Sequence, residues 1–148
     1  MDYRSWFPQN GRPQTPNEPI RPGQPFPIDV RPVAPANGKP VAVGIVSLYC
    51  AHCIDMLPSL VEEIRVHRIP FMLVSNGSPQ ENANMAAFFK AAFPVISLPD
   101  GDALRVFGVA ATPYFFFVRD TGIVADGFQT DEASQFAARW LSFGRRRV

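Results

Sequence analysis

The sequence carries little charge of either sign and has no long hydrophobic run. Only 18% of its 148 residues are charged, and 14 basic against 13 acidic residues leave a formal net charge of +1. This balance gives no electrostatic reason to expect nucleic acid or an anionic membrane as the main partner. No apolar run approaches the roughly 20 residues that span a bilayer. With 47% hydrophobic residues, the chain is long enough for one domain with a substantial core.

Cysteine and histidine are also scarce. Cys50 and Cys53 are the only cysteines, too few for the disulfide framework of a small secreted protein. A structural zinc site is not expected either, because there is no second C-x-x-C and His52 and His67 are the only histidines. We therefore expect no metal and no cofactor.

Proline is abundant but unevenly distributed. Ten of the sixteen prolines lie in the first 40 residues, where they deny the backbone helical and ladder hydrogen bonds. We therefore expect a flexible, proline-rich lead-in at 1–21, one domain at 22–143 and a basic tail at 144–148. No apolar signal-peptide core follows Met1. A native start and a spacer left after removal of an export signal both remain open.

The hydrophobic pattern alternates between strand and helix periodicity. Buried strands are expected at 41–48, 70–75, 95–98, 114–118 and 123–128, with a turn at 99–101 and a hairpin turn at 119–122. Helices are expected directly after Cys50, from 79, around 103–107, and from 131 until Gly144 ends the last one. This order predicts an α/β fold in which helices flank a central mixed sheet on both faces. Its early crossovers should be parallel and its final hairpin antiparallel.

The second helix has a clear start signal and an apolar pattern. Ser78 and Glu81, with proline between them, form a capping box. The same helix is expected to bury one face, made of Met85, Phe88, Phe89 and Ala92.

The chemistry is concentrated where the first strand meets the first helix. Cys50-Ala51-His52-Cys53 brings two thiols together across one helical turn. Cys50 should be the more acidic, because the free N–H groups and dipole of a helix N-terminus favour an anion. Cys53 should be more buried and less acidic. One attacking thiolate and one resolving thiol are what disulfide exchange requires.

These residues resemble the thioredoxin superfamily. Besides the two cysteines, Pro58 stands where the family kinks its active-site helix, and Thr112-Pro113 stands where it places a cis-proline. The resemblance covers about residues 22–143. It is strongest to the extracytoplasmic TlpA/MauD-like redoxin branch, since Pro113 stands 60 positions after Cys53, which leaves room for that branch's extra strand and helix.

The resemblance implies a thiol-disulfide oxidoreductase acting on protein substrates and served by a redox partner protein. A cis bond at Thr112-Pro113 would let a substrate segment pair with the backbone of residue 112, with Tyr49 contributing to the apolar rim. The family favours the bacterial periplasm or the outer face of a membrane, reached through an anchor or signal that this chain lacks. Without that signal, a cytoplasmic location stays open.

His52 and two apolar positions distinguish this site within the family. A histidine at the position of His52 can stabilise the Cys50 thiolate, so we expect a redox potential less reducing than thioredoxin's roughly −270 mV. Gly44 and Met56 occupy positions where relatives carry a carboxylate that moves the proton of the buried thiol. Asp55 is near, but 100° around the helix, and is expected to face solvent.

Two other functions remain as alternatives. Ser47 and Cys50 fit the T/S-x-x-C of a peroxiredoxin-type thiol peroxidase, although Pro113 does not fit that family. A non-enzymatic module that handles metal or binds partners through the same fold is the second alternative.

Overall fold

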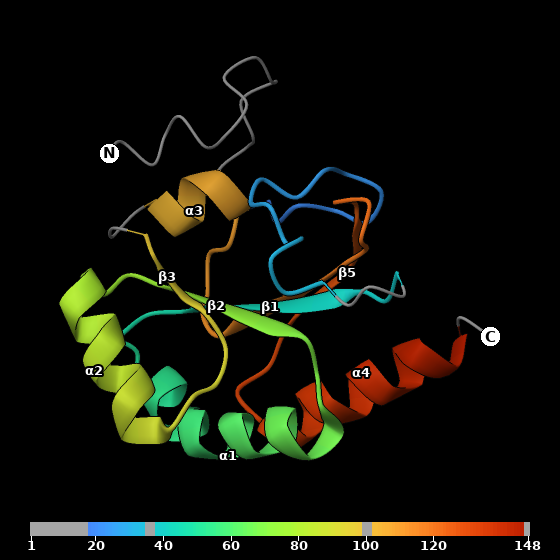
Figure 1. Cartoon of the computed structure of the whole chain (residues 1–148). Coiled ribbons are helices and arrows are strands. Elements are labelled where there is room, and N and C mark those ends of the chain that lie inside the picture. The colour runs from blue at the N-terminus through green and yellow to red at the C-terminus, as the bar shows by residue number, and fades with distance from the viewer. Residues whose placement is uncertain (1–17, 35–37, 99–101, 147–148) are drawn as a thin grey trace.

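Five strands form one mixed sheet in the order β3-β2-β1-β4-β5 (Figure 1). The structure, a computed structural model, describes residues 18–34, 38–98 and 102–146. The strands are β1 (Val41–Val46), β2 (Phe71–Ser75), β3 (Val95–Ser97), β4 (Tyr114–Val118) and β5 (Val124–Gln129). β1 pairs in parallel with β2, and β2 with β3, whereas β4 runs antiparallel to both β1 and β5. The predicted α/β fold with a mixed sheet is confirmed.

In the described part of the chain, four helices cover the two faces of the sheet: α1 (Ala51–His67), α2 (Pro79–Phe89), α3 (Asp102–Phe107) and α4 (Ala133–Arg146). In Figure 1, α1, α2 and α4 lie on one side of the sheet, and α3 lies on the other together with residues 18–34. All six residues of β1 are buried, because this central strand is covered on both faces. No helix in the described ranges is long and apolar enough to cross a membrane.

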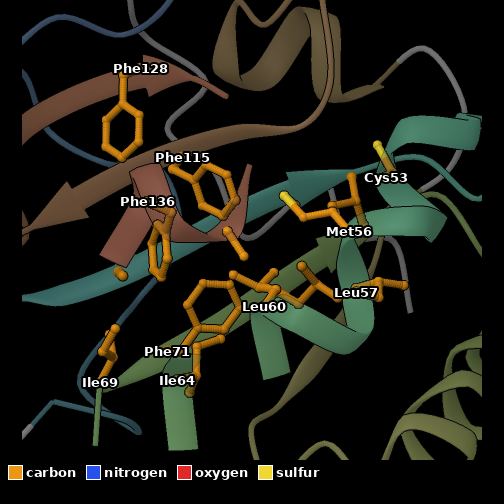
Figure 2. Packing of buried hydrophobic residues seen from close by; sticks show 14 of the residues in the cluster. Cys53, Met56, Leu57, Leu60, Ile64, Ile69, Phe71, Phe115, Phe128 and Phe136 are labelled. Atoms are coloured by element: carbon orange, nitrogen blue, oxygen red, sulfur yellow. The ribbon is translucent and has the colours of Figure 1, made fainter. Parts of the chain in front are cut away.

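Two apolar clusters fill the two layers. The cluster beneath α1 and α4 combines phenylalanines of the sheet with leucines of α1, and Cys53 lies at one end of it beside Met56 (Figure 2). The other cluster joins the opposite face of the sheet to α3 and to Ile20, Phe26 and Val30. The dithiol is thus attached to the core through its second cysteine.

Both ends of the domain differ from the expected boundaries. Ile20, placed in the lead-in by the sequence, is only 6% exposed, and its N–H donates to the Phe107 carbonyl at 3.2 Å. The packed region therefore begins before residue 22. At the other end Gly144 does not end α4, which continues to Arg146. Trp140 and Phe143 pack against the core and hold the last turns, which outweighs the roughly 1 kcal/mol helix penalty of glycine.

The second helix has the predicted start but a different buried face. Its capping box is present, with Ser78 Oγ accepting from the Glu81 N–H at 3.1 Å and Glu81 Oε1 accepting from the Ser78 N–H at 3.0 Å. Phe88, expected to be buried, is 79% exposed, whereas Asn82 is 3% exposed. The inward face follows Asn82, Met85 and Phe89, and Phe88 lies about 90° away from it. Ala92 lies beyond the helix, and the expected turn at 99–101 falls outside the described residues.

Candidate active site

Cys50 caps the N-terminus of α1, four residues after β1 ends. Its sulfur accepts the backbone N–H of Cys53 at 3.2 Å. Cys50 is partly exposed, whereas Cys53 is fully buried, and both are free thiols. The predicted geometry, with one accessible sulfur and one buried sulfur on a single helical turn, is present.

The loop before β4 approaches this pair from 62 residues away. The Cys50 thiol donates to the Thr112 carbonyl oxygen at an Sγ–O distance of 3.6 Å. The bond between Thr112 and Pro113 is cis, and Pro113 is buried. The structure therefore brings together four of the positions that the sequence singled out, namely Cys50, Cys53, Thr112 and Pro113.

The environment shifts the pKa values of the two thiols in opposite directions. Burial alone would raise the pKa of Cys50, but hydrogen bonds with the side chains of Cys53 and Thr112 and from the backbone N–H groups of Cys53 and His52 lower it below its ordinary value of 9.0. Burial raises the pKa of Cys53 to about 11, and its hydrogen bond to Cys50 acts in the same direction. Cys50 is therefore the more readily ionised of the two.

His52 reaches the site through its backbone, while its side chain turns elsewhere. Three-quarters of the side chain is exposed, and the imidazole Nδ1 lies 3.7 Å from Asp131 Oδ2. Both residues line a shallow groove between α1 and α4 that also includes the exposed Asp55. Asp55 faces this groove rather than the core, in agreement with the helical geometry argued from the sequence.

No carboxylate can be accommodated at the first of the two apolar positions. A Cβ at Gly44 would lie 2.8 Å from Phe71 Cζ and 3.2 Å from Phe115 Cε1, so core side chains already fill the space. Met56, at the second position, is 4% exposed and packs in the same cluster as Cys53 (Figure 2). The buried thiol thus has apolar neighbours at both positions.

Two further residues complete the surroundings of Cys50. Tyr49, expected to contribute an aromatic rim, is 81% exposed and its ring is available on the surface. Asn76, which the sequence did not single out, hydrogen-bonds the turn that leads into Cys50. Its only sequence signal is a position directly after a buried strand, at the same sheet edge as the cysteines. Among the described residues, no group of three or more His, Cys, Asp or Glu side chains could hold a metal ion.

A mixed sheet with this strand order, and a C-x-x-C at the start of the first helix, define the thioredoxin-like fold. Solved structures with that fold match this chain. A secreted disulfide oxidoreductase of Mycobacterium tuberculosis is 17% identical with a TM-score of 0.57, and the match covers 71% of this chain and 82% of the other. A thiol:disulfide interchange protein from Bacteroides sp. is 14% identical with a TM-score of 0.59, covering 85% and 88%. The thioredoxin domain of a thiol-disulfide oxidoreductase from Bacteroides vulgatus is 16% identical with a TM-score of 0.60, covering 82% and 98%. Neither a protein-family model nor a curated protein matches the sequence.

Proposed function

We propose that this protein is a thiol-disulfide oxidoreductase that exchanges disulfides with protein substrates. The observation that carries the proposal is the asymmetry of the dithiol. Cys50 is accessible, its sulfur accepts the Cys53 backbone N–H at 3.2 Å at the N-terminus of a helix, and its pKa is lowered. The Cys53 thiol is buried, and its pKa is raised. The similar solved structures described as disulfide oxidoreductases support the same chemistry.

The reaction follows from this asymmetry. The Cys50 thiolate attacks one sulfur of a substrate disulfide, the substrate S–S bond breaks, and the leaving thiolate takes up a proton. Cys53 then loses its proton and attacks the Cys50 sulfur of the mixed disulfide, which releases the second substrate thiol. The substrate gains two electrons and the protein is left with a Cys50–Cys53 disulfide. The same steps in reverse oxidise a substrate dithiol, and a redox partner protein resets the couple in either direction.

The neighbouring residues supply the surface on which a substrate would lie. The Thr112 carbonyl is 3.6 Å from the attacking sulfur, and Pro113 follows it directly. The exposed ring of Tyr49 stands one residue before Cys50. We propose that a substrate segment binds across Tyr49, Thr112 and Pro113. The tuning of the redox potential by the His52 side chain stays a prediction. The backbone N–H of His52 lowers the pKa of Cys50.

The peroxidase alternative is not favoured. The Ser47 hydroxyl, which would have to act on peroxide, accepts hydrogen bonds from the Tyr49 N–H and the Asn76 side chain. The groups that lower the pKa of Cys50 are Cys53, Thr112 and the His52 backbone, and none of these is an arginine.

Trapping of the mixed disulfide tests the proposal. A Cys53→Ser variant, incubated with a peptide that contains a disulfide, should accumulate a covalent adduct at Cys50 that dithiothreitol releases. The matched Cys50→Ser variant should form none, because its remaining thiol is buried. Equal adduct formation by both variants, or none by either, would refute the assignment, and rapid sulfenic acid formation with peroxide but no exchange would point to a peroxidase.

A further inference from the structure

The turn that presents Cys50 is built from residues with little preference for a turn. Its four residues are 47–50, and the Cys50 N–H donates to the Ser47 carbonyl at 3.1 Å. The two central residues are Leu48 and Tyr49, whereas glycine, proline, asparagine and aspartate are the residues that favour such positions. The only local help is Ser47, whose hydroxyl accepts the Tyr49 N–H at 3.1 Å.

One side chain from the neighbouring strand end holds this turn at two points. Asn76 Oδ1 accepts the Leu48 N–H at 2.8 Å, and Asn76 Nδ2 donates to Ser47 Oγ at 2.8 Å. The single amide of Asn76 therefore provides an acceptor for the Leu48 N–H and fixes the Ser47 hydroxyl. Both ends of the amide are used, so its orientation is determined.

The residue that follows Asn76, Gly77, is held by its neighbours. The Gly77 N–H donates to Ser75 Oγ at 3.1 Å, and the Gly77 carbonyl accepts from Asn82 Nδ2 at 3.3 Å and from the Ser97 hydroxyl. A Cβ at Gly77 would lie 2.5 Å from Leu48 Cδ1, so the strand end and the turn pack directly against each other. The clamp is thus attached to β2, β3 and α2 rather than to a free loop.

The clamped turn contacts both cysteines. The Ser47 carbonyl accepts a hydrogen bond from the Cys50 backbone N–H. Burial raises the pKa of Cys53, and a hydrogen bond from the Ser47 backbone opposes that rise. A displacement of the turn would therefore change the position of Cys50 and the surroundings of Cys53 together.

We propose that Asn76 is a positioning residue for the thiol chemistry, which holds the 47–50 turn so that the Cys50 sulfur stays at the N-terminus of α1 and opposite the Thr112 carbonyl. This positioning role extends the proposed function and rests on it, because Cys50 is the thiol that exchange would use. Asn76 acts on the cysteines through its hydrogen bonds with Ser47 and Leu48.

The test is the pH profile of Cys50 alkylation by iodoacetamide, measured in a Cys53→Ser background. Adding Asn76→Ala should reduce the rate at neutral pH by about fivefold, the factor that corresponds to one hydrogen bond of ordinary net strength, and should move the midpoint of the profile to higher pH. Ser47→Ala removes the hydroxyl that accepts the hydrogen bond from Asn76 Nδ2, and it should also move the midpoint of the profile to higher pH. Because the two residues act as one unit, the double variant should shift the profile little more than either single variant.

Two control variants separate positioning from a general loss of stability. Val124→Ala truncates a buried side chain at the opposite end of the sheet, and Asn84→Ala removes an exposed asparagine of α2. Both should leave the profile unchanged, even where Val124→Ala lowers Tm as much as Asn76→Ala does. A profile unchanged in both Asn76→Ala and Ser47→Ala would overturn the inference, as would a shift of equal size in Val124→Ala.

Failure of the proposed function has a different signature. In that case the protein with both cysteines would exchange no disulfide with any peptide, while the alkylation profiles would still report whether Asn76 positions Cys50. If Asn76→Ala does not fold, Ser47→Ala alone decides the matter, because its shift supports the clamp and an unchanged profile refutes it.

Discussion

Cys50 and Cys53 have the same side chain and are three positions apart, yet their pKa values shift in opposite directions. The sulfur of Cys50 receives an N–H at 3.2 Å at the open end of a helix, whereas Cys53 is fully buried. Charge on the first sulfur is stabilised by donors, and charge on the second is opposed by burial. A difference of one helical turn therefore decides which of the two thiols ionises more readily.

This difference predicts how stability depends on pH at the alkaline end. The folded pKa of Cys53 is about 11, above its ordinary value of 9.0. Between these values the unfolded chain loses the thiol proton first, so the free energy of unfolding should fall as pH rises from about 9 to about 11, by at most about 1.4 kcal/mol per pH unit from this one group. The depressed pKa of Cys50 has the opposite sign, because its contribution is present above 9.0 and is lost as pH falls through the folded pKa.

Urea unfolding of the reduced protein at a series of pH values measures this effect. A Cys53→Ala variant removes the group and should lose stability less steeply over the same range, whatever its stability at neutral pH. Parallel curves for the two proteins would contradict the assigned environment of Cys53.

At the scale of elements, β1 connects the site to the core. It lies between β2 and β4, and Gly44 at its centre faces Phe71 and Phe115, whose rings occupy the space of the missing side chain. The strand therefore supports the dithiol turn and at the same time excludes a carboxylate from the neighbourhood of Cys53.

Substitution of that glycine tests how tightly the strand is packed. Gly44→Ala should lower the free energy of unfolding by about 1–3 kcal/mol, because its Cβ would overpack a filled core. Gly144→Ala is the matched control, since nothing lies within 4 Å of its added Cβ and alanine is the better helix former. Chemical denaturation should show the loss in the first variant and an unchanged or slightly higher stability in the second. Equal effects would mean that the centre of the sheet is not filled as described.

At the scale of the whole molecule, the N-terminal segment completes the second layer. Phe26 is 7% exposed, and its ring lies 5.4 Å from the rings of both Phe107 and Phe116. The Gly23 and Phe26 N–H groups donate to carbonyls of the β4–β5 hairpin region at 2.8 Å. The segment that precedes the first strand therefore closes the face of the sheet opposite the cluster of Cys53.

Removal of the Phe26 ring should destabilise the whole domain. Phe26→Ala is expected to lower the free energy of unfolding by about 3–5 kcal/mol, as for other buried phenylalanines. Phe88→Ala deletes an equally large ring that is 79% exposed, and should change stability by no more than about 0.5 kcal/mol. Guanidinium unfolding followed by fluorescence measures both, and similar losses for the two variants would show that residues 20–30 are not part of the cooperative core.

Local sequence patterns predicted most of the helices and strands and the position of the two thiols. Periodicity predicted the strands, the capping box predicted the start of α2, and the C-x-x-C spacing predicted two thiols on one helical turn, because all of these depend on residues close together in the chain. The same local patterns misplaced Phe88 and Ile20, since burial depends on which element packs against them.

The contacts between distant residues came from the three-dimensional packing alone. Thr112 lies opposite Cys50 across 62 residues, Asn76 clamps a turn 28 residues before it, and the His52 imidazole faces Asp131. Each of these contacts depends on the order of strands in the sheet and on the angle at which a helix leaves it. Local sequence preference does not encode such distances, because they are set by the packing of the whole core.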